Sequence, residues 1–138
     1  LIAVFLSAPV CSGNSSVIDE NEDGKPDQWI EELADDQFRV TKDRDFDGVS
    51  DYSLLYHGDG NKEYEELDFN FDGSMDDFYY YAAGVLDYRT VDTNYDGQID
   101  LWVYLSEGVY VAKIERDTDH DGEVDYVKTY GQSSQGVK

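Results

Sequence analysis

The chain has 138 residues, which suits one ordinary domain or one repeat array. Its 32 acidic and 10 basic residues give a formal net charge of -22, which argues against binding to nucleic acid or to anionic membranes. A disordered acidic chain has few aromatic residues, whereas this one has twelve Tyr, six Phe and two Trp. We therefore expect a folded protein whose partners include cations.

The first 16 residues divide into two segments of different composition. Residues 1–10, LIAVFLSAPV, are apolar and predict a strand, and they are too few to cross a bilayer as a helix. We expect no transmembrane segment. Residues 11–16, CSGNSS, are small and polar and predict a linker. Cys11 is the only cysteine, so no intramolecular disulfide is expected.

Residues 17–130 predict five repeats, and each begins with the same nine-residue pattern. Aspartate occupies positions one, five and nine, asparagine or aspartate position three, and glycine position six. The pattern starts at Asp19, Asp43, Asp68, Asp92 and Asp117, so successive starts are 24, 25, 24 and 25 residues apart. A period in this range is typical of a repeat architecture. Residues 131–138, GQSSQGVK, lack the pattern and predict a tail.

Between successive loops the sequence predicts two strands joined by a turn. The clearest case is residues 101–116, LWVYLSEGVYVAKIER, where SEG interrupts two runs of β-branched and aromatic residues. The other turns are expected at ADDQ (34–37), HGDGN (57–61) and AAG (82–84). The predicted fold class is therefore all-β: tandem antiparallel β-hairpin repeats of 24–25 residues, joined by calcium-binding loops in an elongated array.

Large aromatic residues recur at every second position of these predicted strands. Phe78 and Tyr80 are one example, and Trp102 and Tyr104 are another. Residues two apart in a strand project from the same face of a sheet. We expect them to form a core and cross-strand pairs, and the alternative is a platform for a ligand such as carbohydrate.

The nine-residue pattern is suited to binding calcium, a hard cation that takes six to eight oxygen ligands. We predict side-chain ligands at positions one, three, five and nine, and a backbone carbonyl at position seven. Glycine at position six permits the sharp turn. The predicted ligands are Asp19, Asn21, Asp23, Lys25 and Asp27; Asp43, Asp45, Asp47, Val49 and Asp51; Asp68, Asn70, Asp72, Ser74 and Asp76; Asp92, Asn94, Asp96, Gln98 and Asp100; and Asp117, Asp119, Asp121, Glu123 and Asp125.

About five Ca²⁺ ions are expected, one for each loop. No nitrogen or sulfur ligand recurs in the pattern, which disfavours zinc and copper. Magnesium requires a stricter octahedron and is the less favoured alternative.

The motif resembles the calcium loops of EF-hands, dockerins and thrombospondin type 3 repeats, over these nine residues of each repeat only. An EF-hand has helices on both sides and a bidentate glutamate at position twelve. Position twelve here is Ile30, Leu54, Tyr79, Val103 or Lys128. The resemblance implies the ion and its ligand positions, and it is nearest in kind to the thrombospondin loops, where calcium is structural. Without the twelfth ligand we expect the modest affinity of extracellular modules, in a bacterial-type secreted or surface protein.

The sequence favours a calcium-stabilised structural protein that forms a fibre. Residues 1–10 would either assemble it by packing on the next subunit or cap their own first repeat. A surface module that binds carbohydrate is the alternative, and a calcium sensor or buffer is disfavoured by the weak affinity expected. We do not expect an enzyme, because the repeat accounts for most carboxylates and neither His57 nor His120 lies beside a plausible nucleophile.

Overall fold

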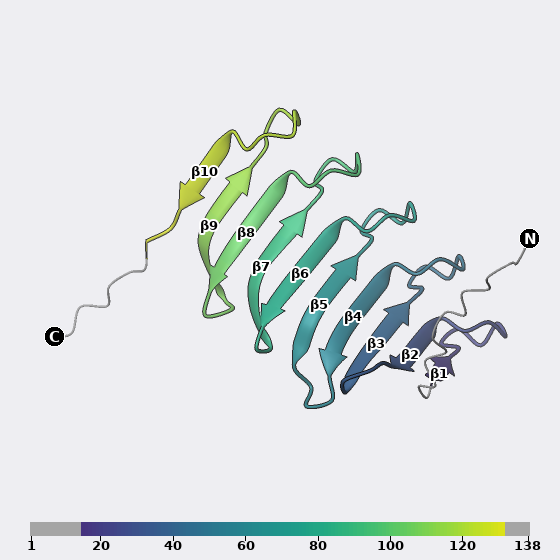
Figure 1. The fold of residues 1–138 in the computed structure, drawn as a ribbon. Coiled ribbons are helices and arrows are strands. Elements are labelled where there is room, and N and C mark those ends of the chain that lie inside the picture. Colours follow the sequence, from purple (N-terminus) through teal and green to yellow (C-terminus); the bar gives the residue numbers. More distant parts are fainter. Residues whose placement is uncertain (1–14, 132–138) are drawn as a thin grey trace, which may run out of the picture.

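A computed structural model describes residues 15–131, which form one open antiparallel sheet of ten strands in chain order (Figure 1). This confirms the predicted all-β array of hairpins. The strands are β1 (Ser15–Ile18), β2 (Gln28–Glu32), β3 (Gln37–Lys42), β4 (Tyr52–His57), β5 (Lys62–Leu67), β6 (Asp77–Ala82), β7 (Val85–Val91), β8 (Leu101–Ser106), β9 (Tyr110–Arg116) and β10 (Tyr126–Thr129). The described residues contain no helix that could span a membrane.

The predicted N-terminal strand and nearly all of the predicted tail lie outside the described residues. The predicted linker is described only at its end, where it differs from the expectation. Ser15 and Ser16 lie in β1, opposite Glu31 and Ile30 of β2. Backbone pairing with β2 makes these small polar residues a strand, although their composition predicts a linker.

The ends of the strands form two unlike sides of the sheet, which we call the loop edge and the turn edge. All five nine-residue loops lie along one edge, and the hairpin turns lie along the other (Figure 1). The connections at the turn edge span residues 33–36, 58–61, 83–84 and 107–109, and the pairing register shifts only next to them, after Leu55, Tyr80 and Tyr104. Differences in repeat length are thus absorbed toward the turns, which keeps the loops in register.

One face of the sheet carries a row of tyrosines on four neighbouring strands, Tyr64, Tyr80, Tyr88 and Tyr104, which oppose one another in register. Their ring centroids lie 5.3, 4.3 and 6.1 Å apart in that order, and the Tyr80 and Tyr88 rings are nearly parallel, at 9°. The rings therefore pack against each other along the row. This confirms the predicted cross-strand packing.

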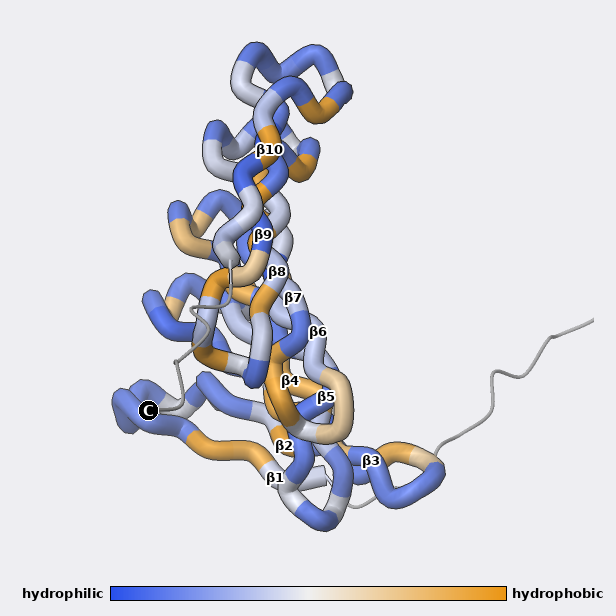
Figure 2. The backbone as a smooth tube through the Cα atoms, turned by 90° about the vertical axis from the view of Figure 1, so that its left-hand side faces the viewer, coloured by the Kyte–Doolittle hydropathy of each residue, from blue (hydrophilic) through white to orange (hydrophobic). Residues whose placement is uncertain are grey.

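The predicted hydrophobic core is not formed: none of the apolar side chains of residues 15–131 is fully buried. The sheet is a single layer whose strand direction turns steadily from β1 to β10 (Figure 2). Cross-strand pairs each contribute about 0.2–1 kcal/mol, so they and the backbone ladder must replace a core. The buried side chains of the described residues are instead polar, and most are aspartates.

Candidate metal sites at the loop edge

Each loop connects the second strand of one hairpin to the first strand of the next. Successive loops are therefore separated by two strands, which is roughly 10 Å along the sheet. The result is a line of acidic loops along one edge, spaced far enough apart for each to hold its own ion.

The first aspartate of each loop folds the loop around its own carboxylate. One oxygen accepts a hydrogen bond from the N–H of the glycine at position six in all five loops, at 2.7–2.8 Å. In loop four the other oxygen of Asp92 accepts the N–H groups of Tyr95 and Asp96, at 2.7 and 3.3 Å. The turn that brings the later ligand positions back toward position one is thus set by backbone donors.

The ninth aspartate closes each loop from the other end. Its carboxylate accepts the N–H of the residue at position two in all five loops. Its own N–H donates to the last residue of the preceding strand, as Asp100 does to the Val91 carbonyl at 3.0 Å. Thr93 and Thr118 add hydroxyl bonds to Asp100 and Asp125, which the sequence pattern does not predict because position two varies.

Positions three and five form a chain of short-range turns between these two aspartates. The side chain at position three accepts the N–H of position five in loops one to four, at 2.9–3.2 Å. The carboxylate at position five accepts the N–H of position seven in all five loops, at 2.7–2.9 Å. Both contacts hold carboxylate or amide oxygens at alternate residues along the loop.

The backbone enters the left-handed region twice in each loop. Glycine occupies the second of these positions, with Gly97 at φ 86°, but position four is never glycine. Phe46, Phe71 and Tyr95 have φ values of 66°, 59° and 62° there. Bulky residues in this region cost of order 1–3 kcal/mol each, so the rest of the loop must hold them in place.

Two of the residues at position four, Phe71 and His120, also contact the preceding loop, which the sequence analysis missed. The Arg44 guanidinium lies 5.3 Å from the centre of the Phe71 ring, and His120 Nδ1 lies 3.5 Å from Asp100 Oδ2. The sequence pattern predicts no contact of this kind for His120. The available signal was that four of the five fourth-position residues have a ring.

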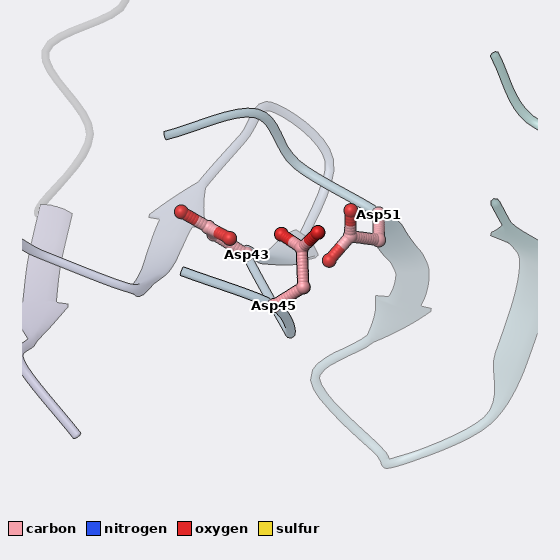
Figure 3. A group of neighbouring side chains, drawn as sticks. All are labelled: Asp43, Asp45 and Asp51. Carbon is pink, nitrogen blue, oxygen red and sulfur yellow. The ribbon is translucent and has the colours of Figure 1, made fainter. Parts of the chain in front are cut away.

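Two loops bring three carboxylates together as a group that could hold a metal ion. Asp43, Asp45 and Asp51 each place an oxygen within 4.8 Å of the others, and Figure 3 shows these side chains gathered at loop two. Asp117, Asp119 and Asp125 do the same in loop five. These are positions one, three and nine of the two loops that have aspartate at position three.

In each group, neighbouring carboxylates help to disfavour the charged form of the aspartate at position three when no cation is bound. The pKa of Asp119 is raised first by the charge of Asp121 and then by partial burial and the charges of Asp125 and Asp117. Burial raises the pKa of Asp45, with further contributions from Asp47, Asp51 and Asp43. A divalent cation would reverse this repulsion, because it stabilises the ionised forms.

The carboxylates at positions one and nine are withdrawn from solvent, except those of Asp19 and Asp125. Most of them retain 4% or less of their exposure, and within residues 15–131 none forms an ion pair with Lys or Arg. The buried loop carboxylates are Asp27, Asp43, Asp51, Asp68, Asp76, Asp92, Asp100 and Asp117. Burying a carboxylate costs several kcal/mol unless hydrogen bonds and an opposite charge compensate.

One further buried carboxylate lies outside the loops. Asp77 at the start of β6 is fully buried, and it accepts two hydrogen bonds from the guanidinium of Arg89 on β7 and one from the Tyr79 hydroxyl, at 2.9 Å. Burial and the Asp77 contact raise the pKa of Tyr79 to about 12. The nine-residue pattern assigns Asp76, at position nine, as a ligand and gives no role to Asp77, which follows it.

Comparison with known proteins adds no relative from which a role could be transferred. No family model, curated protein or solved structure matches the chain. The geometry of the described residues defines an all-β repeat array with acidic loops that could hold metal ions.

Proposed function

We propose that the chain is a calcium-stabilised extracellular structural repeat protein, and a subunit of a surface or secreted fibre. The observation that carries this proposal is the set of buried loop carboxylates, which repeat in register and have no Lys or Arg partner among the described residues. Five ions, one for each loop, would add about ten positive charges to the formal -22.

Calcium fits this role because the described part of the chain has no hydrophobic core to stabilise it. The sheet has no buried apolar residue there, and its acidic edge should repel itself when metal-free. Sites that lack a bidentate twelfth ligand should have dissociation constants of about 10⁻⁴–10⁻³ M, as extracellular modules do. Such sites fill outside a cell, where calcium is abundant, and this is the reason for the proposed location.

Carbohydrate binding, the alternative function, gains no support from the tyrosine row. A sugar-binding platform offers the flat face of an aromatic ring, whereas Tyr80 and Tyr88 stack on each other at 4.3 Å. The assembly role predicted for residues 1–10 falls outside the described residues and stays a prediction. Deleting those residues and imaging the protein by electron microscopy tests it, because the prediction expects filaments to be lost.

Chelation tests the calcium proposal directly. We expect EGTA to lower the melting temperature and the β-sheet circular dichroism signal, and added calcium, but not equimolar magnesium, to restore both. Titration calorimetry should count about five ions for each chain. A melting temperature that does not change on chelation would contradict the proposal.

A further inference from the structure

The described array ends in two outermost strands. Each of them has no neighbouring strand on its outer long side among the described residues. β1 is the first strand of the sheet and β10 is the last. Both present apolar side chains to solvent: Val17 and Ile18 are 56% and 42% exposed, and Tyr126 and Val127 are 46% and 57% exposed. Protein edge strands are usually protected from pairing by charged residues or proline. The eight residues of β1 and β10 contain one charge, Lys128, and no proline.

The outer edges of both strands present backbone groups at alternate residues. Leu33 donates its N–H to Gln37, so odd-numbered residues of β2 bond to β3 and even-numbered residues face β1. Through the register of β1 with β2, Ser16 and Ile18 then bond inward, and the N–H and C=O of Val17 point outward. By the same reasoning, Tyr130 donates to Ala112, so the backbone groups of Val127 point outward from β10.

The loops supply a second pair of complementary groups. Within the array, the first aspartate of each loop donates its N–H to the carbonyl of the ninth aspartate of the preceding loop. These bonds are Asp43 to Asp27 at 2.8 Å, Asp68 to Asp51 at 2.9 Å, Asp92 to Asp76 at 2.8 Å and Asp117 to Asp100 at 3.0 Å. Two members of the series have no such partner in the described part of the chain: the N–H of Asp19 at one end and the carbonyl of Asp125 at the other.

The two end strands are also of opposite type. β10 follows a loop and runs away from the loop edge, as the first strand of every hairpin does, whereas β1 precedes a loop and runs toward it, as every second strand does. A β10 strand beside a β1 strand is therefore antiparallel and completes a hairpin without its turn.

We propose that β10 of one copy pairs with β1 of a second copy and continues the sheet across the junction. The register follows from the hairpins, in which the ninth aspartate of one loop opposes the first of the next, so that Leu101 opposes Arg116. Asp125 then opposes Asp19 of the second copy. The remaining pairs are Tyr126 with Ile18, Val127 with Val17, Lys128 with Ser16 and Thr129 with Ser15.

This junction places apolar pairs on both faces of the sheet and no carboxylate between the two strands. It also places loop five beside loop one of the second copy, so it rests on the proposed function: calcium must fill both loops to remove their repulsion. The contact is heterologous, since it joins two different surfaces, and it leaves one free β1 and one free β10. Repetition gives an open filament that grows by about ten strand spacings, or ~48 Å, for each copy.

Paired cysteines test the register in the full chain. We would combine Val17→Cys and Val127→Cys with Cys11→Ser. Their Cα atoms would lie about 5.5 Å apart across the junction, which suits a disulfide, but ~43 Å apart within one copy. We expect a ladder of disulfide-linked oligomers in calcium. The matched control, Ser16→Cys with Val127→Cys and Cys11→Ser, points its thiols to opposite faces and should give no ladder.

Proline at the junction gives an independent test. Val127→Pro removes only an outward-facing N–H, so it should leave the circular dichroism and the calcium response unchanged. In sedimentation velocity, the wild-type mass should grow with protein concentration, whereas the variant should stay at the mass of one chain.

The outcomes separate this inference from the proposed function. Loss of sheet signal in EGTA together with a single-chain mass in calcium at all concentrations would overturn the junction and leave the calcium proposal intact. That result would also follow if residues 1–14 or 132–138 of the same chain covered the edges. Equal cross-linking in both cysteine pairs would overturn the register. A sheet that is insensitive to EGTA would contradict the proposed function, whatever its mass.

Discussion

The buried carboxylates of this sheet occur in two regions that differ in whether the chain itself supplies a counterion. In β6, Asp77 is fully buried and the chain itself provides the cation, because Arg89 on the neighbouring strand donates two hydrogen bonds to it. At the loop edge, eight buried carboxylates have backbone N–H donors but no Lys or Arg partner among residues 15–131. Among the basic side chains of these described residues, only that of His120 approaches one of them, at 3.5 Å from Asp100.

This difference separates permanent from conditional stabilisation. The Asp77 ion pair forms whenever β6 and β7 pair, so it should be independent of the solution. The loop carboxylates would be fully compensated only when an ion is bound, which would make the loop edge the part of the sheet that responds to its surroundings. Each region can be broken while the other stays intact, and the proposed difference between them can itself be tested.

The largest expected effect is the calcium dependence of the free energy of unfolding. Above the dissociation constant, each site adds about 1.4 kcal/mol for a tenfold rise in calcium, so five independent sites add about 7 kcal/mol. Urea unfolding at several calcium concentrations measures this slope. A slope near zero would mean that the loop carboxylates are stabilised without metal, as Asp77 is.

Breaking the Asp77 site should have the next largest effect and should not depend on calcium. Arg89→Ala leaves a fully buried carboxylate without its cation, which typically costs about 3–5 kcal/mol. The double variant Asp77→Leu with Arg89→Met should recover most of that loss, because it removes both charges. Arg39→Ala is the control, since Arg39 is exposed and forms no ion pair among the described residues, and it should change stability by less than about 0.5 kcal/mol.

Breaking one loop should remove one ion and part of the stability. Asp92→Ala deletes the acceptor for the N–H groups of Gly97, Tyr95 and Asp96, and we expect a loss of about 2 kcal/mol in calcium. Calorimetry should count one ion fewer than in the wild type. Asp87→Ala removes an exposed carboxylate on β7 and should change neither quantity. An unchanged ion count in Asp92→Ala would contradict the assignment of loop four as a site.

A smaller effect is expected at the glycine of the same loop. Gly97 has φ 86° and nothing within 4 Å of where a Cβ would stand, so Gly97→Ala tests backbone strain alone. An alanine in the left-handed region costs about 1–2 kcal/mol. Gly131→Ala, at a glycine that is equally open but not in that region, should be neutral in the same melting experiment. Equal melting temperatures for the two variants would show that the loop relaxes around the added methyl group.

The sequence predicted the array well because two strong periodicities coincide in it. The spacing of Asp19, Asp43 and the later starts defines the loops, and alternating aromatic residues such as Phe78 and Tyr80 define the strands between them. The predicted turns lie where the chain reverses, within a residue or two. Such signals are local, and each hairpin repeats them.

The features that could not be predicted from the sequence depend on contacts between strands. Arg89 contacts Asp77 from twelve positions away, and nothing in the loop pattern pairs these two residues. The single layer was missed for a similar reason. Alternating large residues predict that a strand has a packing face, but they do not show whether another layer covers it, and here the tyrosine rings pack on side chains of the same sheet.

The smallest expected effect is the contribution of Asp45 to the pH dependence of stability, and the prediction concerns its sign. Burial and the neighbouring carboxylates raise the pKa of Asp45 above its ordinary value of 3.8. In chelator, the folded chain therefore binds this proton more tightly than the unfolded chain does. The contribution of Asp45 to the stability of the folded chain is therefore fully present when the pH is below the ordinary pKa. It is lost as the pH rises through the raised pKa.

The variant Asp45→Asn tests this sign, and it places at position three of loop two the residue that loops one, three and four already have. In chelator, its melting temperature should gain on the wild type as the pH rises through that range. In calcium the order should reverse, because the variant gives up a charged ligand. Asp72→Asn is the control with the opposite sign. Hydrogen bonding by Asn70 lowers the pKa of Asp72, so the contribution of Asp72 to the stability of the folded chain is lost as the pH falls. If Asp45→Asn and Asp72→Asn respond alike, repulsion within the acidic triad does not govern the metal-free loop.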